Sequence, residues 1–345
     1  MPEMKVAIGW DGLPHYGAAA IAAGIERLGR PLPVIGTRAA VPFKGLEERL
    51  GQPIHWVERS DRPSWEDLGL EVPDLFLHTG WAYPVFKHLA DAVLARGGKI
   101  VVFVDNNWSG SARQWLGSVY FRLFLRRRFA GAWVPGRSGA RFCRVLGVPA
   151  SRIYEGLYGA DPQLYRSETP LARRPKRFLF VGQLIHRKGV DLMLEDFARF
   201  HRNHPDWRLH CIGNGVLADA VQGPGITRAP FSQADAIARE MSASRFLVLP
   251  SRSEHWGLVV HEAALSGCGL LLSNQVGAAD DLATPENAFR FDARPGGGME
   301  AAFAAAAALN DEELKRAERA SLREAARFGP RAFADSLERI VTDLS

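Results

Sequence analysis

The chain has 345 residues, of which 47% are hydrophobic and 23% charged, and its formal net charge is +5. These values predict a globular protein with two domains and exclude a disordered or fibrous chain. The widely spaced Cys143, Cys211 and Cys268 show no CxxC pattern. This argues against a disulfide framework and a structural zinc site, and favours a reducing compartment. No apolar run approaches about eighteen residues, so we expect neither a membrane span nor a signal peptide.

Short aliphatic runs alternate with longer amphipathic segments, which is typical of parallel sheets covered by helices on both faces. The predicted strands are 5–8, 74–78, 100–104 and 131–134, then 177–181, 208–212, 246–250 and 269–273. They predict an α/β protein with two Rossmann-like units. The polar, proline-bearing stretch 159–175 is predicted as the linker, and the break at 328–330 precedes a last helix.

A glycine-bearing loop follows the first predicted strand and precedes an alanine-rich segment over 18–28. Gly12 and Gly17 permit a tight turn and a close approach of the backbone to a ligand. Two interpretations stay open: the backbone at Gly12 approaches a ligand, or the glycines only shape the turn. His15 is predicted as a surface or helix-capping residue.

The stretch 250–268 carries two glutamates, Glu254 and Glu262, across a predicted loop-to-helix junction. Backbone amides after Gly257 are then first-turn donors at the positive end of a helix dipole, which suits a diphosphate. One carboxylate can meet a sugar while the other meets a ribose. The pattern therefore predicts a sugar-nucleotide site.

This arrangement, with an aromatic-Gly-Leu between the two glutamates, resembles the signature of retaining glycosyltransferases of family 4. The segment 178–191, with Gly182, Gln183, Arg187 and Lys188, is similar to the strand and Lys-Gly segment of that family. The resemblance implies a GT-B fold, in which two Rossmann-like domains face a deep cleft. We expect an acceptor-side domain over 1–165, onto which the C-terminal helix 331–345 packs back, and a nucleotide-sugar-binding domain over 166–330.

The resemblance also implies roles for single residues. Glu262 would accept hydrogen bonds from the ribose and Glu254 from the sugar, while Lys188 would stabilise the leaving diphosphate. The amides of Gly257, Leu258 and Val259 would hold the sugar and phosphates, and Pro230, after the strand-like run 225–228, would lie near the base. Gly182 would approach the donor through its backbone, and the loop of Gly12 would contact the donor phosphates or the acceptor.

Several positions depart from the family pattern. Gln183 stands where an arginine is usual, so the donor diphosphate loses a cation that the neighbouring Arg187 could replace. Asp105 occupies the strand end where the family presents a histidine, which makes it a candidate for a sugar or acceptor contact, with His78 as the alternative. A structural role at the strand end remains open for both. Asp280 and Asp281 stand where the family tends to have Gly-Gly and then Glu.

The predicted reaction is transfer of a sugar from a UDP- or GDP-linked donor to an acceptor hydroxyl, with retention and without a metal or other cofactor. The catalytic candidates are Glu254, Lys188 and Asp105. Two alternatives remain. A GT-B sugar-nucleotide epimerase would use a similar donor site without an acceptor. A non-catalytic relative would bind the nucleotide sugar without turnover.

The segment 106–154 contains nine arginines and no acidic residue, with aromatic residues interleaved. On a helical wheel, 111–129 is apolar nearly all round, so one side could pack on the domain while the other meets lipid. We therefore expect peripheral attachment to the inner face of the cytoplasmic membrane and a lipid-linked or surface glycan acceptor, with solvated arginines on a core helix as the alternative. The modest net charge argues against nucleic acid as a partner. The residues proposed for this surface are Trp115, Arg122, Arg126, Arg127 and Arg128.

Overall fold

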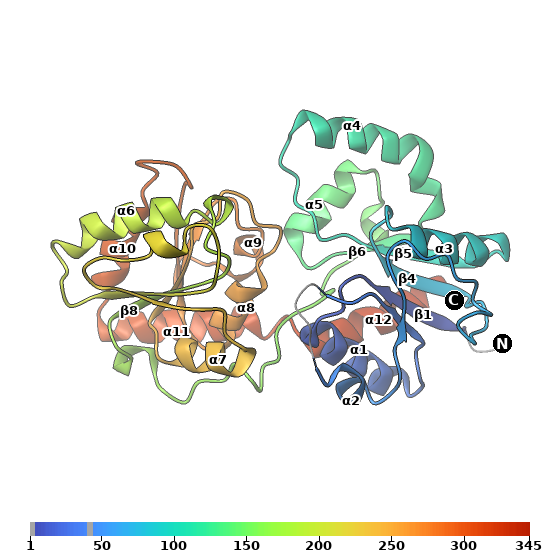
Figure 1. Cartoon of the computed structure of the whole chain (residues 1–345), viewed down its shortest axis with the longest axis horizontal. Helices are drawn as coiled ribbons and strands as arrows, with labels where there is room; N and C mark the ends of the chain where they lie inside the picture. Colours follow the sequence, from blue (N-terminus) through green and yellow to red (C-terminus); the bar gives the residue numbers. More distant parts are fainter. Residues whose placement is uncertain (1–3, 40–43) are drawn as a thin grey trace. The chain divides into compact units, whose positions relative to one another are not determined.

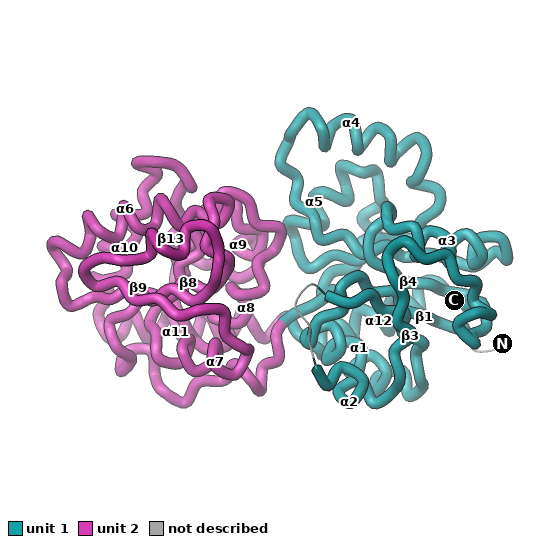
Figure 2. Tube along the Cα trace, in the orientation of Figure 1, with its two compact units in different colours: residues 1–159, 328–345 teal, residues 160–327 magenta. Residues whose placement is uncertain are grey.

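The computed structural model describes residues 4–39 and 44–345, which form two compact units (Figure 1). Unit 1 comprises residues 1–159 and 328–345, and unit 2 comprises residues 160–327 (Figure 2). The chain therefore passes from one unit to the other twice, at 159–160 and at 327–328.

Within the described residues, the strands of unit 1 form one parallel seven-stranded sheet in the order β3-β2-β1-β4-β5-β6-β7. The strands are β1 (Val6–Trp10), β2 (Val34–Gly36), β3 (His55–Trp56), β4 (Leu75–Thr79), β5 (Lys99–Phe103), β6 (Gly131–Trp133) and β7 (Ile153–Tyr154). The α-helices are α1 (His15–Leu28), α2 (Leu46–Leu50), α3 (Pro84–Ala95), α4 (Ala112–Tyr120), α5 (Arg137–Val145) and α12 (Pro330–Leu344).

Unit 2 holds a parallel six-stranded sheet in the order β10-β9-β8-β11-β12-β13. The strands are β8 (Arg177–Val181), β9 (Arg208–Ile212), β10 (Ile226–Ala229), β11 (Phe246–Leu249), β12 (Gly269–Ser273) and β13 (Ala288–Phe291). The helices are α6 (Val190–His201), α7 (Ala234–Ser242), α8 (Leu258–Leu265), α9 (Ala279–Leu282), α10 (Met299–Ala307) and α11 (Asp311–Ala325), with the single turn η5 (His186–Lys188) before α6.

The two predicted Rossmann-like sheets are confirmed, and all eight predicted strands occur within two residues of their expected bounds. The run 225–228 corresponds to β10. The prediction missed β2, β3, β7 and β13, which have two to four residues each. Strands this short do not show a period in the sequence, and their neighbours in the sheet define them.

Strand order reverses between β1 and β4 in unit 1 and between β8 and β11 in unit 2. At such a switch point the connections leave toward opposite faces of the sheet, which opens a crevice outside the carboxyl ends of the two central strands. The loops after these strands are therefore the places where each unit can bind a ligand.

Helix α12 completes unit 1 although it comes last in the chain. Its Phe333 stacks on Trp133 of β6 with ring centroids 4.4 Å apart. Gly24 of α1 leaves room for the helix, because a Cβ there would lie 2.7 Å from a methyl group of Leu337. Arg27 of α1 forms ion pairs with both Asp335 and Glu338. Apolar packing and charge thus attach the C-terminal helix to the first unit.

The segment 111–129 differs from the single helix assumed for the helical wheel. Helix α4 ends at Tyr120, and a π-helical turn, η1 (Phe121–Leu125), and a 3-10 turn, η2 (Arg126–Arg128), follow it. Phe121, the first residue of the π-helical turn, is buried and stacks on Phe129 with centroids 5.8 Å apart. Figure 1 shows α4 at the margin of unit 1.

Candidate functional site

Gly189 sets the conformation of the loop that follows β8. Its φ is +72°, and a Cβ there would lie 2.0 Å from the carbonyl oxygen of Pro250 at the end of β11. Only glycine permits this close approach in a left-handed conformation. As a result, η5 lies directly against the loop after β11, on the two strands that flank the switch point.

This contact brings together two predicted site residues. The Lys188 ammonium forms an ion pair with Oε2 of Glu254, and their side chains are only 13% and 12% exposed. The Ser251 hydroxyl donates to the same carboxylate oxygen at 3.1 Å. The site therefore holds a cation and an anion, each partly shielded from water, at the carboxyl ends of adjacent strands.

Arg187 and Gln183 do not join this pair. Arg187 donates from Nη1 to the carbonyl oxygen of Ser253 at 2.9 Å. The side chains of Arg187 and Gln183 are both exposed. Arg252 makes two hydrogen bonds to Asp191, at 2.7 and 2.8 Å. This bidentate contact is the main reason why the pKa of Asp191 falls to about 2. The arginines of this region thus fix the two loops together.

Helix α8 begins immediately after Gly257, whose φ of +91° makes the turn into the helix. A Cβ at this position would lie 3.1 Å from Cγ of Glu254. The first-turn amides, those of Leu258 and Val259 among them, have no partner within the helix by geometry. The backbone of Glu254 is held in turn by Gln275 and Gly277, at 3.3 Å each. The loop that carries Glu254 and the start of α8 therefore have fixed positions relative to each other.

Glu262 lies in the middle of α8, eight positions after Glu254, and is partly buried. Burial raises the pKa of its carboxyl to about 7, and a hydrogen bond with Tyr165 opposes that shift. Tyr165 is buried, and both burial and the nearby Glu262 raise the pKa of its hydroxyl. Near neutral pH, Glu262 is consequently divided between its neutral and ionised forms.

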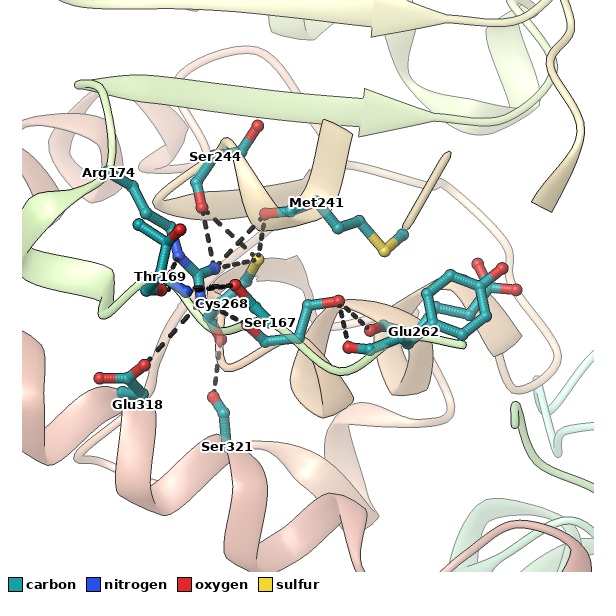
Figure 3. A network of polar contacts seen from close by, with 11 residues as sticks. Ser167, Thr169, Arg174, Met241, Ser244, Glu262, Cys268, Glu318 and Ser321 are labelled. Carbon is teal, nitrogen blue, oxygen red and sulfur yellow. Dashed lines mark hydrogen bonds and ion pairs between the residues drawn. The ribbon is translucent and has the colours of Figure 1, made fainter. Parts of the chain in front are cut away.

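A buried arginine supports this part of α8 (Figure 3). Arg174 is 1% exposed and donates to the carbonyl oxygens of Thr169, Met241, Ser244 and Ser266 and to Sγ of Cys268. The Ser266 hydroxyl donates to the carbonyl oxygens of Tyr165 and Glu262, at 2.8 and 3.1 Å. The network therefore connects the end of α8 to the segment that carries Tyr165.

Pro230 lies apart from this cluster. It follows β10, the edge strand two positions from β8, and it is exposed. The neighbouring Phe231 is half exposed, and its amide lies 3.4 Å from Oδ1 of Asn214, which follows β9. Pro230 and Phe231 therefore offer an apolar surface at the edge of the sheet where β9 and β10 have their carboxyl ends.

The candidates of unit 1 follow its central strands. Gly12, after β1, has φ +60°, and its amide donates to the Thr37 hydroxyl at 2.7 Å. Asp105, after β5, is exposed and accepts a hydrogen bond of 2.6 Å from the Tyr158 hydroxyl. His78 near the end of β4 is 2% exposed and lies against aromatic rings. Asp105 therefore faces solvent at the strand ends, whereas His78 belongs to the interior.

Sequence reasoning missed several residues of both units. Asp11, beside Gly12, accepts from Thr37 at 2.7 Å and from Arg59 at 2.6 and 2.9 Å. His261 of α8 is buried, with its two ring nitrogens 2.9 Å from the amide of Ala160 and from the carbonyl oxygen of Ala325. The position of Asp11 directly after a buried strand was a usable signal. For His261 there was none, because its partners are 101 and 64 positions away.

The departure at Asp281 also has a structural explanation. Its carboxylate accepts a hydrogen bond of 2.9 Å from the Trp256 indole, and both residues are buried. Trp256 directly precedes Gly257, so this contact fixes the loop that carries Glu254. The aspartate is part of the scaffold of α8.

The proposed membrane residues occupy α4, η1 and η2. We call the exposed apolar side chains of this segment the α4 ridge; they are Trp115, Leu116, Val119, Tyr120, Leu123 and Phe124. Leu116 and Leu123 are 73% and 70% exposed.

The arginines of the segment are less available than the ridge. Arg122 and Arg126 donate from Nε to the carbonyl oxygens of Val145 and Gly147, at 2.8 and 2.9 Å. Arg128 forms an ion pair with Asp91. Arg127 is exposed. None of the helices in residues 4–39 and 44–345 combines the length and apolarity that a membrane crossing requires.

Part of the chain is similar to a known protein family. Residues 162–327 match the family model "Glycosyl transferases group 1". The chain is 27% identical over 189 residues to a D-inositol 3-phosphate glycosyltransferase of Segniliparus rotundus, covering 51% of this chain and 42% of that protein. It is 25% identical over 240 residues to an alpha-D-kanosaminyltransferase of Streptomyces kanamyceticus, covering 64% and 62%. The chain thus spans less than two thirds of the length of these curated relatives.

Solved structures match the whole chain in fold. Anabaena HepE in complex with UDP superposes with a TM-score of 0.76 at 15% identity, covering 99% of this chain and all of the other. A glycosyltransferase from Rickettsia africae gives a TM-score of 0.73 at 11% identity, covering 100% and 99%. The chain therefore has the GT-B fold, and its residues 162–327 match the glycosyl transferases group 1 model.

Proposed function

We propose that the protein is a retaining glycosyltransferase that moves a sugar from a UDP- or GDP-linked donor to an acceptor hydroxyl. The observation that carries this proposal is the Lys188–Glu254 pair at the switch point of the group 1 domain, with Glu262 further along α8. A structural neighbour with the same fold, Anabaena HepE, is described in complex with UDP-glucose, which supports a nucleotide-sugar donor.

In this scheme the donor diphosphate lies over Lys188 and the amide end of α8. Lys188 exchanges Glu254 for a phosphate oxygen, and the released carboxylate accepts hydrogen bonds from the sugar. The bond between the anomeric carbon and the phosphate oxygen breaks, and the diphosphate leaves with the electron pair. The acceptor oxygen bonds to the same face of the carbon and passes its proton to the leaving phosphate. A fixed ammonium lowers the barrier because negative charge develops on that phosphate.

Glu262 holds the ribose in this proposal, and Asp105 is a candidate for a contact with the sugar or acceptor. Gln183 contributes a neutral amide to the diphosphate site. Arg187 does not replace the missing cation, because it donates to the carbonyl oxygen of Ser253. No step of the scheme requires a metal ion.

The experiment is a panel of UDP- and GDP-sugars, each incubated with and without candidate acceptors, in the presence and absence of EDTA. NMR of the product should show the anomeric configuration of the donor. Conversion of the donor sugar without any acceptor would instead identify an epimerase. Nucleotide binding without turnover under any condition would identify a non-catalytic protein.

We further propose that the acceptor is presented at an anionic membrane surface, the inner face of the cytoplasmic membrane. The α4 ridge supports this, since six large apolar side chains in the ten residues 115–124 stay in solvent. Exposed Arg127 and Arg113 add positive charge beside the ridge. Because several arginines already have protein partners, apolar insertion contributes more to this attachment than charge does.

A further inference from the structure

A pocket of unit 1 lies beside the α4 ridge, with walls from β4, α3, β5 and the segment 120–129. Its cavity volume is about 150 Å³. Its apolar lining includes Ala90, Leu94, Ile100, Leu125 and Phe129. Because a cavity of this size binds benzene, the pocket accommodates roughly six carbon atoms.

The charged groups at this pocket leave one positive charge without a counterion. Lys87 of α3 lines the pocket and is exposed. Arg128 also lines it, and its guanidinium forms an ion pair with Asp91, one turn after Lys87 on α3. Lys87 itself has no ion pair among the described residues. His78 in the wall adds no charge at neutral pH, because burial lowers the pKa of its imidazole to about 4.

An apolar interior below a positive rim suits a ligand with two chemically different ends. An apolar chain gains free energy by leaving water for the interior. A phosphate head beside Lys87 gains from the ammonium, which binds phosphate as a point charge. A cationic head would be repelled, and a neutral head would gain nothing from Lys87. Trp81 and Tyr120 complete the lining with rings that have one apolar and one polar part, which suits the boundary between chain and head.

The pocket opens next to the surface proposed to meet the membrane. Tyr120 belongs both to the pocket lining and to the α4 ridge, and its side chain is 56% exposed. Leu125 of the lining directly follows Phe124 of the ridge. A bilayer in contact with the ridge would therefore bring its own anionic lipids to the opening of the pocket.

We infer that this pocket binds one phosphate-headed amphiphile, with the phosphate at Lys87 and Arg128 and the first carbons of the apolar chain in the interior, and that the amphiphile is an anionic lipid of the membrane. The source of the ligand rests on the proposed membrane attachment. Binding of the amphiphile itself does not, so it is tested with the full chain in the absence of vesicles.

The test compares hexyl phosphate with hexanol, hexyltrimethylammonium and inorganic phosphate, which change or remove one end of the ligand. Dissociation constants are measured by calorimetry, and hexyl phosphate should bind the wild type most tightly. Lys87→Gln should raise its dissociation constant by about fivefold, the scale of one cation beside an anionic lipid, and should leave that of hexanol unchanged. Arg96→Gln is the matched control, because Arg96 is exposed at the end of α3 and does not line the pocket.

A second variant tests the apolar interior. Ala90→Leu, which places extra methyl groups in the pocket, should weaken binding of hexyl phosphate and hexanol but not of inorganic phosphate. Since Lys87 is exposed, Lys87→Gln should unfold at the wild-type temperature, which keeps the charge test independent of how well Ala90→Leu folds. Equal hexyl phosphate affinity in the wild type and Lys87→Gln, or hexyltrimethylammonium bound as tightly as hexyl phosphate, would overturn the assignment.

The lipid source is tested with phosphatidylcholine vesicles that carry photoreactive hexadecyl phosphate. The probe should label Leu94 or Leu125 in the wild type, and less in Ala90→Leu. Labelling confined to the α4 ridge would overturn the membrane lipid as the ligand. Loss of vesicle binding with hexyl phosphate binding retained would overturn the membrane attachment and the lipid source, and would support the pocket as a site for a free amphiphile.

Discussion

Lys188 and Glu254 form an ion pair across 66 positions of sequence, because Gly189 lets the loop after β8 lie against the end of β11. Each residue is the partner of the other before a donor arrives. In the proposed reaction, a phosphate group that replaces Glu254 on Lys188 would release the carboxylate for the sugar. The pair thereby keeps two charges organised in a partly buried site.

Replacing Lys188 with Ala should lower kcat by about 10² to 10³, which corresponds to roughly 2 to 4 kcal/mol of lost transition-state stabilisation. The matched control is Arg187→Ala, which removes a neighbouring exposed cation that contacts a backbone carbonyl. Steady-state kinetics with a saturating donor distinguish the two. Comparable losses in both variants would mean that general positive charge, and not the position of Lys188, supports turnover.

Nucleotide affinity should increase as the pH rises through 7. The folded-state pKa of Glu262 is about 7, above its ordinary 4.5, so below pH 7 this carboxyl is mostly neutral in the fold. An ionised carboxylate is the stronger acceptor for ribose hydroxyls. Calorimetric titration with UDP and GDP between pH 5.5 and 8.5 should show a steeper rise in the wild type than in Glu262→Gln, in which only the terminal phosphate of the nucleotide, with a pKa of about 6, contributes.

The same shift has a consequence for stability. Because the pKa is raised in the fold, Glu262 destabilises the protein increasingly as the pH rises from 4.5 to 7, by up to about 3 kcal/mol above pH 7. Glu262→Gln should therefore be more stable than the wild type at pH 8 and equally stable at pH 4.5. Denaturant unfolding at the two pH values measures the difference. A stability gain that is the same at both would contradict the raised pKa.

Gly189→Ala should destabilise unit 2 and reduce turnover together. Its φ is +72° and the new Cβ would lie 2.0 Å from the Pro250 carbonyl, so the loop must move away from β11. Gly51→Ala is a matched control, since Gly51 has the same φ of +72° with open space around it. The control should lose only about 1 kcal/mol, the general cost of a left-handed alanine. Thermal unfolding and kcat of both variants separate the clash from the strain.

Membrane attachment should depend on the α4 ridge more than on its arginines. Leu123→Glu with Phe124→Glu should abolish co-sedimentation with anionic vesicles, because charges replace two of the three most exposed side chains of the ridge. Arg127→Gln should weaken binding by roughly 1 kcal/mol, and added salt should remove that contribution. Leu322→Glu is the control, because Leu322 is also exposed but lies in unit 2. Unchanged binding of the double variant would assign the ridge to another partner.

Several features of the protein follow from the sequence by itself. Runs such as 178–181 and 269–272 form strands because every residue in them is apolar and buried, as expected for a parallel sheet covered on both faces. The positions of Glu254, Gly257 and Glu262 around a helix start follow from spacing along one short segment. Fold class and the main candidate residues were therefore available from local information.

Tertiary structure decided which of these residues meet. The ion pair of Lys188 with Glu254, the pairing of Arg187, Arg122 and Arg126 with backbone carbonyls, and the burial of His78 depend on strand order and loop contacts between distant segments. The raised pKa of Glu262 depends on the same packing, because desolvation is a property of the surroundings. A sequence pattern carries the period of one element, whereas charge pairing and burial arise only when several elements pack together.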